Sequence, residues 1–205
     1  MTAQRDIDLV ALICSKLCHD LAGSVGAVSN GAELLAEETD ATMREEAIRL
    51  IAQSANDAAR RLAFFRLALG ASGGLDEPMA SADLARVAGD YFQGGRVRLL
   101  PLVGLPASLP KPLAKALLLG LSVMAMALPR GGALRLDVQQ GEWRVRAEGT
   151  PSKLPDDVAG SLLSDAAVEE PGGALARHAA DLAASAGYRL GLEAGPEGAA
   201  LRFSK

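Results

Sequence analysis

The stretch SKLCHDLAGSVGAVSNGAELL, residues 15–35, lies within a helical pattern yet contains three glycines, Gly23, Gly26 and Gly31. A glycine inside a helix costs about 0.5–1 kcal/mol relative to alanine. Three of them directly after His19 therefore need a reason. Apolar residues recur around them at three- and four-residue steps, which predicts one long helix over about residues 7–38.

A second long helix is predicted over residues 43–69. Its apolar positions keep an unbroken 4-3 spacing, namely Ile48, Ile51, Ala55, Ala58, Leu62, Phe65 and Leu69. The short connection ETDATMREE contains a capping-box pattern, Thr42 to Glu45, and makes the two helices antiparallel neighbours. Because so long a hairpin cannot bury both of its seams alone, we expect a homodimer that forms a four-helix bundle. Packing of the seams against the rest of the same chain is the alternative.

The segment LGASGGLDEP, residues 69–78, divides the chain into a helical part, 1–72, and a mixed part, 73–205. In the second part we predict helices at SADLARVAGDYF, KPLAKALLLGLSVMAMAL and GGALARHAADLAASAG. Strands are predicted at RVRLL, ALRLDVQQ and EWRVRAEG, and a hairpin at YRLGLEAGPEGAALRF. The predicted fold class is therefore α+β, a long helical hairpin followed by an α/β sandwich.

Composition narrows the function classes. The formal charge of −4 argues against nucleic-acid binding, which needs a basic surface. The polar start MTAQRDIDLV is unlike a signal peptide, and the apolar run over residues 116–128 is too short to span a bilayer. With only two cysteines as well, we expect a cytoplasmic protein that does not enter a membrane.

His19 is the candidate reactive residue. On a helical wheel it points about 180° away from the apolar seam. The residues within about 60° of it are small or polar, and they include Lys16, Ala22, Gly23, Gly26 and Asn30. An exposed imidazole beside low side chains suits a docking surface for another protein. The alternative is an ordinary surface histidine beside glycines that allow close helix packing.

A metal site is the less favoured interpretation of this stretch. Cys14, Cys18 and His19 point in different directions around the helix, so they cannot converge on one ion. We therefore expect no metal, and we interpret Cys14 as a small core residue with Cys18 at its flank. The second histidine, His178, is interpreted as structural.

The stretch LCHDLAGSVGAVSNGAELL resembles the phosphoacceptor helix of the alphaproteobacterial ChpT-type histidine phosphotransferases. The core H-D-L also resembles the H-box of histidine kinases. In those kinases a polar residue and then a proline follow four and five residues after the histidine, where this chain has Gly23 and Ser24. The resemblance implies a dimeric, kinase-like fold. The polar residue often assists dephosphorylation in the kinases, so the departure at Gly23 counts against a phosphatase role.

In the second part, the nucleotide-binding motifs expected from that resemblance are missing. The helix that corresponds to the kinase N-box contains no asparagine, and RVRAEGTPSKLP lacks D-x-G. The lid region retains only the pair Gly172 and Gly173, which is a weak phosphate signal. The resemblance thus implies a degenerate kinase ATPase domain, and we expect neither ATP nor another cofactor.

The resemblance further implies a role for His19. Its Nε2 would take a phosphoryl group from the aspartyl phosphate of one receiver domain, belonging to a hybrid histidine kinase, and pass it to the receivers of response regulators. The receivers would supply Mg²⁺. Asp20 would orient or deprotonate the imidazole, or would simply be solvated. Lys16 would offset phosphoryl charge or, as we favour, be solvated.

Two R-V-R repeats supply paired arginines that alternate as in strands, Arg96 with Arg98 and Arg144 with Arg146. Either pair could contact an acidic receiver surface, and a solvated sheet face is the alternative. Two rival functions stay open at this point. One is an active histidine kinase, and the other is a dimeric module that binds receivers without chemistry.

Overall fold

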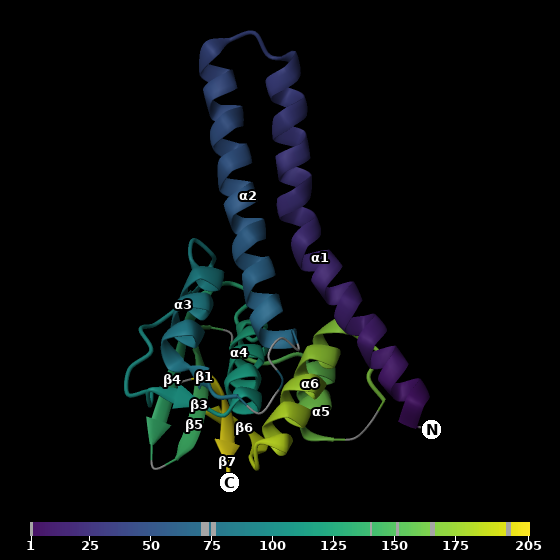
Figure 1. Cartoon of the computed structure of the whole chain (residues 1–205), viewed down its shortest axis with the longest axis vertical. Coiled ribbons are helices and arrows are strands. Elements are labelled where there is room, and N and C mark those ends of the chain that lie inside the picture. Colours follow the sequence, from purple (N-terminus) through teal and green to yellow (C-terminus); the bar gives the residue numbers. More distant parts are fainter. Residues whose placement is uncertain are drawn as a thin grey trace.

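The computed structural model describes residues 2–70, 74, 77–139, 141–150, 152–164, 167–195 and 198–205. Two long helices, α1 (Thr2–Glu37) and α2 (Ala41–Leu69), form an antiparallel hairpin whose tip projects beyond the rest of the molecule (Figure 1). Both helices begin earlier than predicted. Part of the predicted boundary segment, residues 71–73, 75 and 76, lies outside the described residues.

The turn between the two helices is held by Asp40 and Arg44. The carboxylate of Asp40 accepts hydrogen bonds from the backbone N–H groups of Thr42 and Met43, both at 3.0 Å. Arg44 Nη1 donates to the carbonyls of Leu35 and Glu38 at 2.7 and 2.9 Å. The predicted capping box that begins at Thr42 was therefore wrong, because an aspartate two residues earlier caps α2 instead.

Small residues of both helices are buried where α1 and α2 meet, and Ile51 of the predicted α2 seam lies against one of them, Gly31. Ser24 and Gly31 of α1 are buried, and so is Ala47 of α2. A Cβ on Gly31 would lie 2.7 Å from Ile51 Cγ1, which confirms that this glycine serves helix packing. Val10, a member of the predicted seam on α1, is exposed. On the helical wheel it lies about 40° to 60° away from Ser24 and Gly31.

The second part of the chain contains a five-stranded sheet in the order β2-β4-β5-β7-β6. Its members are β2 (Val97–Leu99), β4 (Gly132–Gln139), β5 (Glu142–Glu148), β6 (Arg189–Gly195) and β7 (Gly198–Ser204). Strands β2 and β4 are parallel, and the other neighbours are antiparallel. A separate two-stranded pair joins β1 (Met79–Ala80) to β3 (Ser108–Leu109), and we had not predicted it.

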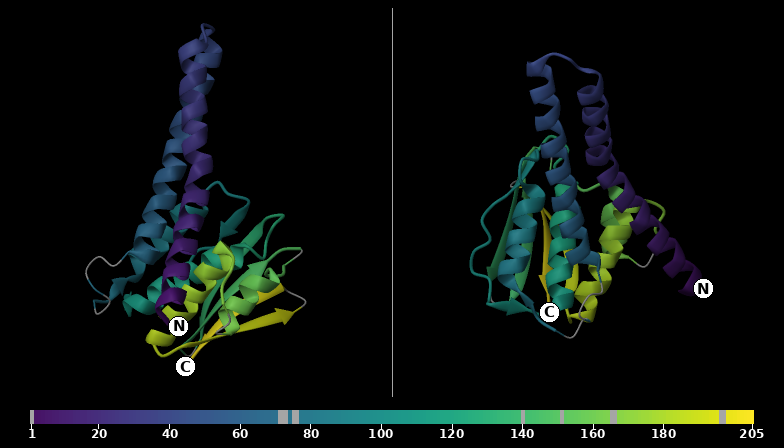
Figure 2. Two further views of the ribbon diagram at one scale, coloured as in Figure 1. Left: turned by 90° about the vertical axis from the view of Figure 1, so that its right-hand side faces the viewer. Right: turned by 45° about the horizontal axis from the view of Figure 1, so that its top comes forward.

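Four helices accompany the sheet, α3 (Ser81–Phe92), α4 (Lys111–Ala125), α5 (Asp156–Leu163) and α6 (Pro171–Ser185). Helix α4 contacts the sheet through β4, β5 and β7 and also contacts α2, while α6 contacts α1 (Figure 2). These helices therefore lie between the sheet and the hairpin. The sequence pattern did not reveal α5. The α+β fold class and the long helical hairpin are confirmed.

Helix α4 forms the centre of the aliphatic core. Every residue from Leu113 to Met124 is buried. Gly120 has a packing reason, because a Cβ there would lie 3.1 Å from the Phe203 ring and 3.3 Å from Leu201 Cδ2. The backbone of α4 thus approaches the sheet closely.

Two features attach the base of the hairpin to this core. The ring of Phe64 stacks on that of Tyr91 with centroids 4.0 Å apart, and Phe65 meets the same ring edge-on. The buried Lys115 donates a hydrogen bond to the carbonyl of Gly70, at the end of α2. Burial and the nearby charge of Lys111 lower the pKa of Lys115.

Helix α1 is long and apolar enough over Gln4–Glu37 to cross a membrane, judged by length and composition alone. This is weak evidence, since a core helix of a soluble protein or a signal sequence near an N-terminus passes the same test. Lys16, His19 and Asp20 lie in the middle of that segment, where a bilayer would be most costly to charged and polar groups.

Candidate functional site

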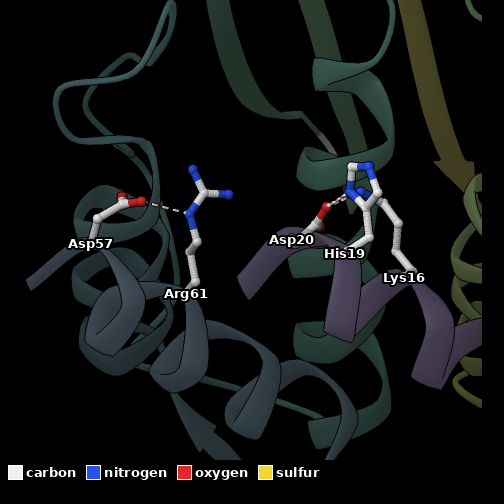
Figure 3. Close-up of polar contacts among 5 residues, drawn as sticks. All are labelled: Lys16, His19, Asp20, Asp57 and Arg61. Atoms are coloured by element: carbon white, nitrogen blue, oxygen red, sulfur yellow. Dashed lines mark hydrogen bonds and ion pairs between the residues drawn. The ribbon is translucent and has the colours of Figure 1, made fainter. Parts of the chain in front are cut away.

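His19 lies midway along α1, on the side that borders α2 and α3. Its side chain is 86% exposed. The His19 Nδ1 atom lies 3.5 Å from Asp20 Oδ1 (Figure 3). The same carboxylate oxygen forms an ion pair with Lys16, which lies one turn before Asp20 on the helix. Lys16 is thus paired with Asp20 within the chain.

This geometry favours one tautomer of the imidazole. A carboxylate beside Nδ1 favours the form in which Nδ1 carries the proton, so that Nε2 keeps its lone pair. Neighbouring residues on a helix do not normally face each other. Asp20 nevertheless reaches the ring by bending back along the helix surface. The site can therefore present an accessible nitrogen nucleophile.

His19 faces an open groove between the hairpin and the sheet domain. Asp20, Gly23 and Ser24 line it from α1. The opposite side is formed by Asp57 and Arg61 of α2 together with Tyr91 of α3 and the loop Gln93 to Gly95. The sequence analysis missed this groove, because its α2, α3 and loop residues are distant in the chain from His19.

A polar cluster joins the two helices beside His19. Ser24 Oγ donates to Asp57 Oδ2 at 2.6 Å, and Arg61 Nε donates to the same oxygen at 2.8 Å. Arg60 adds a longer ion pair to Asp57 Oδ1 at 3.7 Å. The spacing D-x-x-R-R places both arginines three and four residues after Asp57, and this was the sequence signal that could have revealed the cluster.

The charges in this cluster reinforce one another. Burial raises the pKa of Asp57, but the hydrogen bonds from Ser24 and Arg61 and the two arginine charges outweigh it, and the pKa is lowered. Burial alone would lower the pKa of Arg61, but the hydrogen bond to Asp57 and the charge of that carboxylate outweigh it, so the pKa is raised. The Arg61 guanidinium carbon lies 6.0 Å from the centroid of the Tyr91 ring. Burial raises the pKa of that tyrosine.

The structure brings only some of the predicted site residues together. His19, Asp20 and Gly23 all line the groove, whereas Ala22, Gly26 and Asn30 lie outside its lining. A Cβ on Gly23 or on Gly26 would meet no atom within 4 Å among the described residues. These two glycines therefore serve no close contact within the described chain, unlike Gly31.

The predicted arginine pairs lie on the sheet, away from His19. Arg144 and Arg146 share one face of β5 and form ion pairs, Arg144 with Glu193 at 3.3 Å and Arg146 with Asp137 at 2.6 Å. Arg98 lies in β2, but Arg96 precedes the strand, so the expectation that both alternate within one strand was wrong for Arg96. Directly before β2, the Arg96 carbonyl accepts a hydrogen bond from the Gly132 N–H at 3.2 Å.

The prediction that Cys14 is a small core residue was wrong. Cys14 and Cys18 are both exposed in the single chain, so Cys14 is not a core residue there. Among the described residues no three His, Cys, Asp or Glu side chains are grouped as a metal site would require. The absence of a metal stays a prediction.

Comparison with known proteins gives the site its context. Residues 81–198 match the family model "Histidine phosphotransferase C-terminal domain". The protein phosphotransferase ChpT of Brucella abortus (strain 2308) is 37% identical over 169 residues, covering 80% of this chain and 78% of that protein. A solved structure of a bacterial phosphotransferase aligns with a TM-score of 0.78 at 29% identity, covering 97% of this chain and 96% of the other.

These findings place the protein among the phosphotransferases of two-component phosphorelays. The chain belongs to the histidine phosphotransferase family, as its sequence had led us to expect. A histidine kinase domain from Erythrobacter litoralis EL346 aligns with a TM-score of 0.42 at 15% identity, covering 89% of this chain and 93% of the other. The relation of the sheet domain to kinase ATPase domains stays a prediction.

Proposed function

We propose that the protein relays phosphoryl groups between receiver-domain aspartates through a phosphohistidine at His19. The single observation that carries the proposal is the 86% exposed imidazole beside Asp20, facing an open groove. Its family membership supplies the phosphotransfer activity. Since the chain contains only two histidines and His178 is half-buried on α6, His19 is the acceptor we assign.

The transfer needs few groups from this chain. The Nε2 lone pair forms a bond to phosphorus while the bond from phosphorus to the aspartyl oxygen breaks, and the receiver's carboxylate leaves with the electron pair. The Nδ1 proton stays on the ring, and the Asp20 carboxylate 3.5 Å away stabilises the imidazolium charge. Transfer to the second receiver reverses these steps, and each receiver brings its own Mg²⁺.

We further propose that two copies of the chain pair through their hairpins. Val10, Ile48 and Leu62 are 60%, 53% and 58% exposed. They belong to the regular apolar seams of α1 and α2, on sides that the partner helix in the chain leaves uncovered. A second hairpin would cover them and leave His19, on the opposite side of α1, accessible. The homodimer would thus be a four-helix bundle.

The proposed activity uses no ATP. The glycine pair of the expected lid has a packing role, because a Cβ on Gly173 would lie 2.6 Å from Ser161 Oγ and one on Gly172 would lie 3.3 Å from Met126 Sδ. The adjacent groove is lined by Asp157, Glu169 and Glu170. Those carboxylates would repel nucleotide phosphates. Calorimetric titration with Mg-ATP should show no saturable binding, and micromolar binding would favour the active kinase.

Receivers are the partners we propose, and the cytoplasm is the proposed location. The sheet face that carries Arg144 and Arg146 is a candidate second contact for an acidic receiver, even though acids within the chain already pair with both arginines. The small residues Ala22, Gly23, Gly26 and Asn30 would lie beneath the receiver next to His19. Lys16 would help to neutralise the phosphoryl group only if it left Asp20.

The test is incubation with receiver domains from the same genome that carry radioactive aspartyl phosphate. We expect acid-labile, base-stable label on the chain, its loss in His19→Ala, and its retention in His178→Gln, the matched control. Circular dichroism should show both variants folded. If no receiver labels the wild-type chain, or if His19→Ala still accepts label, the proposal fails. A receiver-binding module without chemistry would bind receivers equally well with and without His19.

A further inference from the structure

The groove beside His19 holds a positive charge in excess. Asp20 forms an ion pair with Lys16 and its charge also acts on Arg61, while Asp57 forms ion pairs with both Arg60 and Arg61. These five residues, with the neutral Tyr91, are the titratable groups near His19 that line the groove or pair with its lining. Their charges sum to +1 in a groove that, in the proposed function, receives a dianionic phosphoryl group.

Arg61 is held in place more firmly than a surface arginine. Its Nε donates to Asp57 Oδ2 at 2.8 Å, and Ser24 of the facing helix donates to the same oxygen at 2.6 Å. The Tyr91 ring lies beneath the guanidinium, and only 33% of the arginine side chain is exposed. Because this fixed position lowers the entropy lost on binding, the guanidinium is preorganised for a ligand.

The guanidinium also points in a useful direction. Figure 3 shows Arg61 reaching into the space between α2 and α1, with its two terminal nitrogens directed away from Asp57. His19 and Asp20 extend from α1 on the same side of the hairpin. An arginine whose Nε is occupied still offers two planar N–H groups, which match two oxygens of a phosphoryl group.

We propose that Arg61 is the phosphoryl-binding residue of this groove, and that Asp57 and Ser24 are positioning residues that aim its guanidinium at the phosphorus attached to His19. This inference rests on the proposed transfer through His19. Arg61 takes no part in bond making. It donates hydrogen bonds to the equatorial oxygens while the nitrogen–phosphorus bond forms and the oxygen–phosphorus bond breaks, and again on the return step.

The charge balance explains why the cluster contains an aspartate at all. Without Asp57, Arg60 and Arg61 would repel each other, and a free arginine would explore many rotamers. With it, one carboxylate orients Arg61 through Nε and leaves the net charge of the cluster at +1. In phosphoryl transfer, such fixed cations act mainly by stabilising charge that spreads over the oxygens.

The first test separates chemistry from docking. Single-turnover transfer from a phosphorylated receiver domain is measured over a range of receiver concentrations for wild type, Arg61→Gln and Arg61→Lys. The matched control is Arg49→Gln, an exposed arginine of the same helix that pairs with Glu46 at 2.5 Å. We expect Arg61→Gln to lower the maximal rate about tenfold to a hundredfold. The half-saturating receiver concentration should change less than about twofold, and Arg61→Lys should recover part of the rate.

The second test needs no receiver. Phosphoramidate is used to phosphorylate His19 directly, and phosphorus NMR follows the formation of phosphohistidine. Arg61→Gln should slow labelling and shift the phosphorus resonance, while Asp57→Ala should slow it as well and Asp57→Asn less so. Thermal melting by circular dichroism checks that each variant is folded.

The outcomes are distinguishable. If wild-type His19 is never labelled, the proposed function fails, and this inference fails with it. If the wild type is labelled and Arg61→Gln keeps its full maximal rate and resonance, this inference alone is overturned. A loss confined to the half-saturating concentration would mean that Arg61 contacts an acidic residue of the receiver, which also overturns phosphoryl binding.

Discussion

Helices α1 and α4 are both rich in apolar residues, yet they have opposite surroundings. In α4 every residue from Leu113 to Met124 is buried. In α1, over the described side chains from Gln4 to Glu37, only Ser24 and Gly31 are buried. Helix α4 thus lies at the centre of the core, whereas α1 exposes apolar side chains along its length.

The difference shows that the two regions serve separate purposes. The core around α4 is completed within one chain, because Phe64, Phe65 and Ala68 of α2 are buried in it together with residues of the sheet domain. The hairpin is held internally by small residues and by the Ser24–Asp57–Arg61 hydrogen bonds. In the proposed function, its apolar side contacts a second hairpin and the side that carries His19 contacts a receiver. The largest effects on folding are therefore expected around α4, and the effects on association or transfer in the hairpin.

The largest effect on folding should come from the centre of α4. Leu117→Ala removes a side chain with 0% exposure and should lower the free energy of unfolding by about 2–5 kcal/mol, because it leaves a cavity. Leu50→Ala, the same change at an exposed position of α2, should cost less than about 1 kcal/mol. Urea denaturation of both variants checks this, and equal costs would contradict the comparison.

Substitutions on the exposed apolar side of the hairpin should weaken the association of two chains. Leu62→Glu places a charge in the proposed dimer interface, so the dimer dissociation constant should rise by at least about a hundredfold, or about 3 kcal/mol. Sedimentation velocity should show a dimer for wild type and a monomer for the variant. Arg49→Glu, elsewhere on α2, is the control. A wild-type protein that is already monomeric would refute the proposed bundle.

The glycines of α1 should separate by their contacts. Gly31→Ala should destabilise by about 1–3 kcal/mol, because the new Cβ would lie 2.7 Å from Ile51 Cγ1. Gly23→Ala should stabilise the helix by up to about 1 kcal/mol, since its Cβ meets nothing within 4 Å. Thermal melting measures both. If receivers dock there, Gly23→Ala should weaken their binding despite the gain in stability.

Removing the carboxylate of the polar cluster should cost about 1 kcal/mol at neutral pH. Because the native pKa of Asp57 is lowered, its contribution is complete above its unfolded pKa of about 3.9 and is lost as the pH falls through the native value. The difference between wild type and Asp57→Asn in urea denaturation should therefore shrink as the pH is lowered from 7 to 3. A constant difference would mean that the carboxylate charge contributes nothing.

The smallest effect should come from His178. Burial lowers its pKa in the folded chain, although Asp181 opposes this shift and Lys115 adds to it. The unfolded chain thus binds more protons just below pH 6.5, and stability should rise with pH through that range. His178→Gln should flatten this slope in urea denaturation between pH 5 and 7.5. An unchanged slope would assign it to other groups.

The sequence predicted the elements better than their contacts. The 3.6-residue periodicity located both hairpin helices and α4, and the alternation of apolar residues located β4 and β5. It missed β1 and β3, which are two residues long, and α5, whose eight residues give too short a pattern. The cap at Asp40 was missed because Thr42 and Glu45 fit a competing motif equally well.

The sequence by itself determined that His19 lies opposite the apolar residues of α1, because this follows from the angle between successive residues of any helix. It could not decide which of two adjacent sides of that helix packs against α2. Nor could it place Arg61 and Tyr91 across a groove from His19. Only the tertiary structure brings together α1, α2 and α3, since contacts between residues far apart in the chain depend on how the helices pack and not on local periodicity.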